Sequence, residues 1–404
     1  MNSNPLSFHI QIHQKIIDNL KVLENWFLKK INSQKLPFYS SFDIRDSNFK
    51  IACVDANLFP AGFNNICEED QKRTSFLIKD YLKKYYPSVK KIMLLAEEHT
   101  RNLYYWDNIF VIKSLIEKAG AIVTVGVPGK KITSTQKITS ASGRKVDLKI
   151  LNQSKSDLII SNNDFSVKYE LPKDIECAPP FFMGWLHRKK HRFFKEYNSL
   201  TKEFAEILKI DSWHFTIETK LFSPFDLQSQ DNLSKLKSAS HKVLESLKKS
   251  YQNFSVKEKP YLFLKNNSGT YGMGIINIHE SEELNHWSYK SRKKMKASKG
   301  ETNIKELIIQ EGIPTALLSK DNKSSEPVIY MIGSQVAGGF LRSHKTKGHK
   351  TNLNSPGLVF KRLCMSDLEI KMKGLAMENV YSWLAKIGSL ALLQEMKNYK
   401  SLNS

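Results

Sequence analysis

The spacing of apolar residues predicts an amphipathic helix near the start of the chain, over residues 10–31. Ile12, Ile16 and Leu20 begin a series of apolar residues at steps of three and four, which places them on one face of an α-helix. Short apolar runs then alternate with helical patterns. The strands are expected at residues 50–54, 91–96, 121–127 and 157–160, and the helices at 69–85 and 105–119. This alternation is typical of a mainly parallel α/β sheet.

Polar loops follow three of these expected strands, at residues 55–65, 97–102 and 161–164. In parallel sheets ligands bind outside the carboxyl ends of the strands. We therefore expect these three loops to build one site.

The pattern changes from about residue 260, where short strands alternate with turns. They are expected at residues 261–265, 273–278, 305–310, 327–332, 335–340 and 358–361, with a hairpin turn at Gly333 and Ser334. A long helix is expected over 366–397. We therefore predict an α/β domain over 1–178, a helical connecting region over 179–259 and an α+β domain over 260–404.

The overall charge is strongly positive, with 62 Lys+Arg against 40 Asp+Glu and a formal net charge of +22. Only nine of the 62 are arginines, the residue that specific base recognition favours. The charge therefore predicts an anionic ligand without establishing nucleic acid as the partner. No apolar stretch reaches the ~18 residues of a membrane span. The four cysteines form no C-x-x-C pair, and a reduced cytoplasm is the expected compartment.

A glycine-rich loop between two strands is the clearest local motif. Lys265 ends one strand, and Gly269, Gly272 and Gly274 follow before the apolar run that starts at Ile275. Glycines let backbone N–H groups approach an anion, and a lysine adds a positive charge for phosphate. A dinucleotide-binding loop would instead open a helix. By itself the motif is equally compatible with an ordinary hairpin turn.

Three later segments support a nucleotide site. An apolar strand ends in Gln310 and Glu311, a hairpin carries Arg342 at its end, and Asn352 and Asn354 stand two residues apart. Residues at this spacing point to one side of an extended chain.

This order of motifs resembles the ATP-grasp fold. More closely, the chain resembles the proteobacterial ATP-grasp glutamate–cysteine ligases, through residues 39–45, 54–65, 264–275 and 352–357. The resemblance covers most of the chain from about 39 to 365. It implies an α+β ATP-grasp domain after the α/β domain, and ligation of glutamate to cysteine with ATP and Mg²⁺ in the first step of glutathione synthesis.

Two alternatives remain. One is another carboxylate–amine ligase of the same fold, since the loop at 55–65 would set the amino-acid substrates. The other is a basic nucleic-acid-binding protein, which should carry basic stripes with interleaved aromatic residues. Only residues 187–194 approach that pattern, and we interpret them as a basic helix face near an anionic ligand.

The resemblance also implies roles for individual residues. Lys265 and Arg342 would act on the transferred phosphoryl group. The expected ATP-binding residues are Lys265, Ser268, Gly269, Gly272, Gly274, Gln310, Glu311 and Ile313.

The implied metal site departs from the family pattern. Asn354 would bind Mg²⁺ with Asn352, where many ATP-grasp enzymes have E-x-N. Because Mg²⁺ normally takes one or two carboxylates along with phosphates, Glu326 or Glu311 is expected to contribute.

The amino-acid substrates would be bound by the N-terminal loops. Arg45 and Arg101 are expected to clamp carboxylates. The expected contacts for the ammonium group, or for orienting glutamate, are Asp55, Asn57, Asn64 and Asn65. For each of these four, an Asx turn or a helix cap is the structural alternative.

Overall fold

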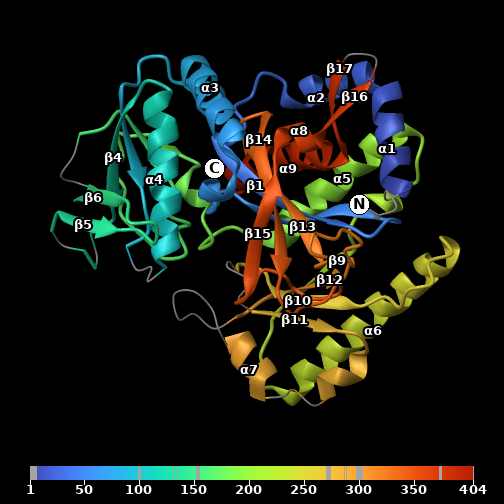
Figure 1. The fold of residues 1–404 in the computed structure, drawn as a ribbon. Helices are drawn as coiled ribbons and strands as arrows, with labels where there is room; N and C mark the ends of the chain where they lie inside the picture. Colours follow the sequence, from blue (N-terminus) through green and yellow to red (C-terminus); the bar gives the residue numbers. More distant parts are fainter. Residues whose placement is uncertain are drawn as a thin grey trace.

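A computed structural model shows three large β-sheets, one short two-stranded sheet and the helices that surround them (Figure 1). It describes residues 7–98, 102–129, 131–132, 134–151, 155–269, 274–285, 287, 289–296, 304–372 and 375–403. In Figure 1 a central antiparallel sheet separates the six-stranded sheet on the left from the four-stranded sheet below.

The central sheet combines strands from both ends of the chain. Its order is β15-β14-β13-β1-β2, and all neighbours are antiparallel. The strands are β1 (Tyr39–Asp46), β2 (Ile51–Asn57), β13 (Ser325–Ile332), β14 (Gln335–His344) and β15 (Leu358–Leu363). The hairpin at Gly333 is confirmed. The strand expected at 50–54 exists, but its place in a parallel sheet was wrong, because it pairs with β1, which in turn pairs with β13.

The six-stranded sheet has the order β5-β6-β4-β3-β7-β8. Its strands are β3 (Lys91–Leu95), β4 (Ile122–Val127), β5 (Gln136–Thr139), β6 (Lys145–Ile150), β7 (Leu158–Ser161) and β8 (Cys177–Ala178). All pair in parallel except β5, which forms an antiparallel hairpin with β6. Helices α3 (Glu68–Tyr85) and α4 (Leu103–Lys118) share its apolar core. All four residues of β7 are buried, as expected for a strand covered on both faces.

The four-stranded sheet is antiparallel, with the order β11-β10-β12-β9. Its strands are β9 (Thr219–Phe222), β10 (Leu262–Asn266), β11 (Ile275–Ile278) and β12 (Leu307–Glu311). A separate apolar core joins this sheet to α6 (Gln230–Asn253), the 3₁₀ turn η5 (Ser281–Asn285) and α7 (Tyr289–Lys296).

The remaining long helices pack together on one side of the central sheet, at the upper right of Figure 1. They are α1 (Ser7–Asp18), α2 (Leu20–Ile31), α5 (Lys190–Leu208) and α9 (Val380–Asn403). Their core includes Phe204 and Trp383, whose rings stack. The first predicted helix is divided at Asn19.

The last predicted helix was placed too early. A short helix α8 (Met365–Leu368) and the hairpin of β16 (Glu369–Met372) and β17 (Leu375–Glu378) precede α9. Short 3₁₀ turns also occur at η1 (Phe63–Asn65), η3 (Phe181–Met183) and η4 (Ser212–His214).

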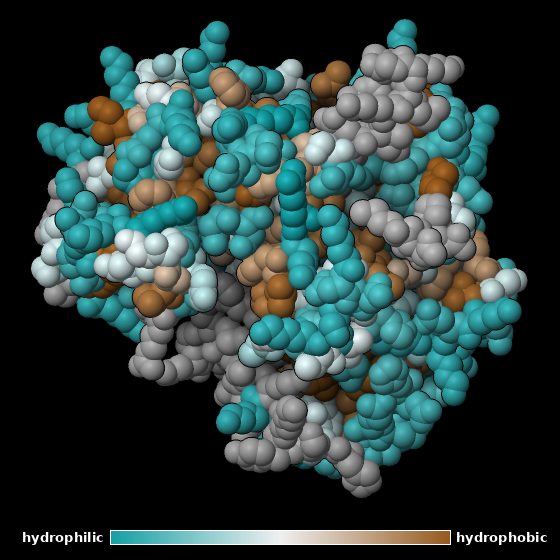
Figure 2. All heavy atoms as spheres, in the orientation of Figure 1, coloured by the Kyte–Doolittle hydropathy of each residue, from teal (hydrophilic) through white to brown (hydrophobic). Residues whose placement is uncertain are grey.

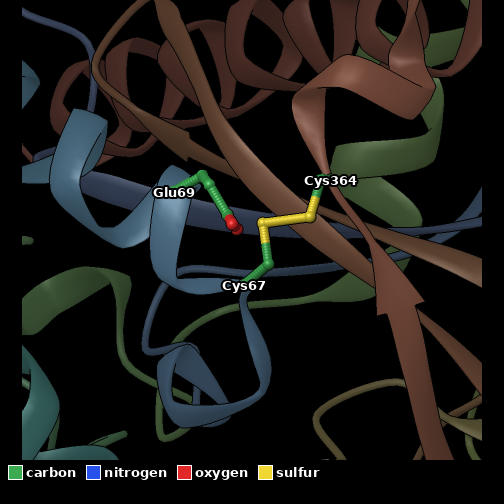
Figure 3. Close-up of side chains that lie close together, drawn as sticks. All are labelled: Cys67, Glu69 and Cys364. Atoms are coloured by element: carbon green, nitrogen blue, oxygen red, sulfur yellow. A yellow bond between two sulfur atoms is a disulfide. The ribbon is translucent and has the colours of Figure 1, made fainter.

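A disulfide joins Cys67, just before α3, to Cys364, just after β15 (Figure 3). A reduced compartment does not predict this bond. Beside it, the Met365 N–H donates to the Asp70 carboxylate at 2.8 Å. Both links fasten the first turn of α3 to the end of the central sheet.

The surface seen in Figure 2 is largely hydrophilic, with apolar side chains scattered between polar ones. Among the described helices, none combines the length and the apolar character needed to cross a membrane.

Candidate active site

A cleft lies between the central sheet and the four-stranded sheet, with an empty volume of about 510 Å³ that includes open space at its mouth. Strands β1, β2 and β13 line one side, and β10, β11 and β12 line the other. The lining residues are Asp43, Arg45, Val54, Asp55, Phe263, Lys265, Ile275, Gln310, Glu311, Ile313, Glu326, Asn352 and Asn354.

Lys265 connects the two sides of this cleft. It lies on β10 with its side chain buried, and its Nζ donates to the Val54 carbonyl of β2 at 3.1 Å. Burial lowers the Lys265 pKa to about 8; the neighbouring cations Lys190 and Arg45 act in the same direction, and Asp55 opposes them. The sequence therefore places a desolvated cation where the two sheets meet.

An apolar wall adjoins Lys265, formed by Phe263, Ile275 and Ile313. Gln310 lies in the same wall, and its Nε2 donates to the Thr219 hydroxyl at 3.3 Å. Its Oε1 is buried and has no hydrogen-bond partner among the described residues. An unpaired buried acceptor is costly, so this atom is available to a donor on a ligand.

Glu311 is committed to a buried ion pair. Its Oε1 lies 2.7 Å from Lys50 Nζ, and each side chain is 1% exposed. Its Oε2 accepts the backbone N–H of Glu218 at 3.1 Å. The carboxylate therefore joins β12 to the turn after β1.

Four charged residues form a cluster along β1, β13 and β14, made of Asp43, Arg45, Glu326 and Arg342. Arg342 Nη1 lies 2.6 Å from Asp43 Oδ2 and 2.9 Å from Glu326 Oε1. Burial raises the Asp43 pKa, with Glu326 adding to this effect and Arg342 opposing it. Arg342 Nε is buried without a partner among the described residues.

Arg45 links that cluster to the loop that carries Asn352 and Asn354, which we call the asparagine loop. Its Nε pairs with Glu326, while Nη1 and Nη2 donate to the carbonyls of His349 and Thr351 at 3.0 and 2.8 Å. The next residues, Asn352 and Asn354, line the cleft. The Asn352 side chain accepts the Asn354 N–H at 2.9 Å, which holds the loop in a turn.

Asp55, at the end of β2, pairs with Lys190 at the start of α5. Burial would raise the Asp55 pKa, but the charges of Lys190 and Lys265 outweigh it and hold the pKa below its usual value. Asp55 is therefore ionised at neutral pH.

Several predicted ligand residues have structural contacts instead of a place in the cleft lining. The Asn57 side chain accepts the Phe59 N–H at 3.0 Å, which is an Asx turn. Asn64 and Asn65 lie in η1. Among the described residues that line the cleft, none of these three is included.

The glycine-rich motif is described only in part. Ser268 Oγ donates to the Arg188 carbonyl at 3.2 Å, and the Gly274 carbonyl accepts the Asn266 N–H at 3.0 Å. Ser268, Gly269 and Gly274 are outside the described cleft lining. Gly272 and Arg101 lie outside the described residues.

Two of the three strand-end loops, at 55–65 and 161–164, meet through internal hydrogen bonds. The third, at 97–102, lies partly outside the described residues. Asn108 Oδ1 on α4 accepts the N–H groups of Gly62 and Phe63 at 2.8 and 2.9 Å. Its Nδ2 donates to Asn162 Oδ1 at 3.2 Å, and Asn162 Nδ2 donates to the Pro60 carbonyl at 2.9 Å. These amides hold the loops together.

Two functional candidates, Asp43 and Lys190, were not singled out from the sequence. Asp43 stood inside the segment that carries the resemblance, and Lys190 stood inside the basic segment at 187–194. The signal was present in each case, but their partners lie 299 and 135 residues away.

Comparisons with known proteins agree with this geometry. A crystal structure of a candidate gamma-glutamylcysteine synthetase from Methylobacillus flagellatus KT superimposes with a TM-score of 0.87, at 28% identity and with 98% of each chain covered. A glutathione synthetase-like effector from Globodera pallida matches with a TM-score of only 0.32 and 11% identity, over 84% of this chain and 76% of that one. That value is too low to support an argument. A search of curated proteins found no match.

The sequence profile of the glutamate-cysteine ligase family, GshA, matches residues 13–396. This range contains every residue that lines the cleft. The chain belongs to the glutamate–cysteine ligase family.

Proposed function

We propose that this chain joins L-glutamate to L-cysteine at the expense of ATP, giving γ-glutamylcysteine, ADP and phosphate. The observation that carries the proposal is a pair of buried cations beside acidic groups in a family member: Lys265 lines the cleft, and Arg342 holds Asp43 and Glu326, which also line it. Such a site suits phosphoryl transfer, which depends on positioning and on neutralising charge.

ATP would bind with its base against Phe263, Ile275 and Ile313 and its phosphates toward Lys265. The unpaired Oε1 of Gln310 supports this placement, because adenine offers an exocyclic amine as a donor. The antiparallel sheet that carries Lys265 and Gln310 supports an ATP-grasp type of nucleotide domain. We assign the Glu311 carboxylate to the Lys50 ion pair and leave only its backbone near the base.

The reaction would proceed in two steps. The γ-carboxylate of glutamate attacks the γ-phosphorus of ATP, forming an acyl phosphate and releasing ADP. The amine of cysteine then attacks the acyl carbon, phosphate leaves with the bridging oxygen, and the amine loses a proton. Arg342 would stabilise the charge on the transferred group through Nε, which has no partner among the described residues. Asp43 and Glu326 hold the guanidinium in place.

Mg²⁺ fits the chemistry of the donors, because hard cations prefer carboxylate and amide oxygens. Asn352, Asn354 and Glu326 would hold it. Both Glu326 oxygens already contact arginines, so the metal would share an oxygen with one of them. The ion would neutralise phosphate charge during transfer.

The amino-acid side of the site would use Asp55 rather than the other predicted loop residues. Asn57, Asn64 and Asn65 have the structural positions described above. Arg45 is held by Glu326 and two carbonyls, which supports a role in fixing the asparagine loop.

The test is release of ADP from ATP, Mg²⁺ and glutamate, with and without cysteine. We expect ADP release to depend on cysteine and to accompany an equal amount of γ-glutamylcysteine. Equal rates with glycine or alanine in place of cysteine would instead support a ligase with different amino-acid substrates. The absence of any amine-dependent ADP release would contradict the proposal.

A further inference from the structure

The basic segment at the start of α5 contains two buried cations, Arg188 and Lys190, each 4% exposed. Burying a charge is costly unless it is paired. Arg188 is anchored away from the cleft opening by Glu395 of α9, at 3.1 Å, and by the Ala56 carbonyl at 2.7 Å. Lys190 instead points to the cleft, where Asp55 is its partner.

Lys190 is held from three directions. Its backbone N–H donates to the Asn267 carbonyl at 2.8 Å, at the start of the glycine-rich loop. Its Nζ lies 4.8 Å from the centre of the Trp185 ring and pairs with Asp55 Oδ1. The ammonium group therefore has a fixed position, and it fixes Asp55 at the end of β2.

Asp55 is the carboxylate that a ligand in the cleft can reach. Its side chain is 37% exposed, against 17% for Asp43, 3% for Glu326 and 1% for Glu311. Asp43 is bound to Arg342, and Glu326 is bound to both Arg45 and Arg342. Glu311 is bound to Lys50. Among these four lining carboxylates Asp55 has the largest exposed fraction, and its partner Lys190 lies outside the described cleft lining.

The position of Asp55 also relates it to the phosphate side of the site. Lys265 Nζ bonds the carbonyl of Val54, the residue just before Asp55. A group held by Asp55 therefore lies beside the lysine that we assign to ATP.

We propose that Lys190 is a positioning residue that holds the Asp55 carboxylate in place and charged to receive the α-ammonium of glutamate. This inference rests on the proposed function and refines its amino-acid side. The amine of cysteine must lose a proton to react, and an ion pair with a carboxylate would keep it protonated. Asp55 therefore suits the ammonium that does not react, which belongs to glutamate.

The test compares Lys190→Met, which removes the charge, with Lys190→Arg, which keeps it. Lys195→Met, at an exposed position on the same helix, is the matched control. In Lys190→Met we expect the KM for glutamate to rise about tenfold or more, as for loss of a close charge pair. The KM for ATP should stay within about twofold, because the Lys265 contact is retained. Lys190→Arg should restore much of the glutamate affinity, and the control should match the parent enzyme.

The pH profile is a second readout. Asp55 faces Lys190 from α5, Arg188 from the segment just before that helix, Lys265 from β10, Asp43 from β1 and Cys53 on its own strand. Lys190 is the cation that lowers the Asp55 pKa most, so the Asp55 pKa must rise when Lys190 is removed. The acidic limb of kcat/KM for glutamate should therefore move to higher pH in Lys190→Met and stay in place in Lys195→Met.

An unchanged KM for glutamate in Lys190→Met would overturn the inference. An equal rise in the KM values for glutamate and ATP would do the same, because it would indicate a general loss of structure. If Lys190→Met does not fold, Asp55→Asn must raise the KM for glutamate alone, and failure to do so counts against the inference. These outcomes are read on an active parent enzyme, whereas an inactive parent would overturn the proposed function itself.

Discussion

The cleft and the junction of the strand-end loops are both rich in polar side chains, but they differ in how those side chains are satisfied. At the junction, Asn108 and Asn162 bond backbone groups and each other. In the cleft, Gln310 Oε1 is buried without a partner among the described residues, as is Arg342 Nε in the charged cluster beside the cleft, and Asp55 remains partly exposed. Unsatisfied polar atoms favour the cleft as the ligand site that we propose, whereas satisfied amides favour a structural role for the junction.

The largest effect should follow from Arg342→Gln. We expect kcat to fall by about 10³-fold, as for other arginines that stabilise a transferred phosphoryl group. The free energy of unfolding should fall by ~3–5 kcal/mol, because Asp43 and Glu326 lose their partner in a buried site. Steady-state kinetics and chemical denaturation measure the two effects.

Arg342→Lys separates those two roles. It keeps a positive charge for Asp43 and Glu326 but lacks the planar fork. We expect most of the stability to return while kcat stays low. A kcat near that of the parent enzyme would show that Arg342 has a structural role and does not act on the transferred phosphoryl group.

Lys265→Met should lower kcat/KM for ATP by about 10²-fold without loss of the folded state. In the parent enzyme, kcat/KM for ATP should fall as the pH rises above about 8, since a Lys265 pKa near 8 means that the cation is lost there. Lys265→Arg keeps its charge at this pH, so its kcat/KM for ATP should not fall in the same pH range. A flat profile in the parent enzyme would argue against Lys265 as the phosphate contact.

The smallest effect on catalysis should come from Asn162→Ala at the loop junction. Losing its hydrogen bonds should cost ~1–3 kcal/mol of stability. The KM values for ATP and glutamate should stay within about twofold of the parent values. A large change in either KM at unchanged stability would erase the distinction between the two regions.

Local periodicity predicted most elements, because helices and strands leave spacing patterns that a single sequence contains. It could not place β2 and its neighbour β1 in the central sheet, because β1 pairs with β13 through residues that are 285 to 293 positions apart in the sequence. The start of α9 was missed because the apolar pattern continues through β16 and β17.

The site was predicted best where a motif carried the chemistry. Lys265, Gln310, Asn352 and Asn354, which carry predicted ligand roles, line the cleft, and those roles stay predictions. The sequence alone could not show whether Asn57 binds a ligand or forms a turn, because an asparagine after a strand is common in both cases. The structure shows an Asx turn. Lys190 gave only a charge within a basic run, and the role that we propose for it rests on the ion pair with Asp55, which the sequence does not show.

Activation of glutamate as an acyl phosphate in the cleft is the central claim, and oxygen-18 transfer tests it most directly. Glutamate labelled with oxygen-18 in its γ-carboxylate would be turned over with ATP and cysteine, and the phosphate analysed by mass spectrometry. We expect one labelled oxygen in each phosphate formed. Phosphate without label, released together with γ-glutamylcysteine, would contradict the account.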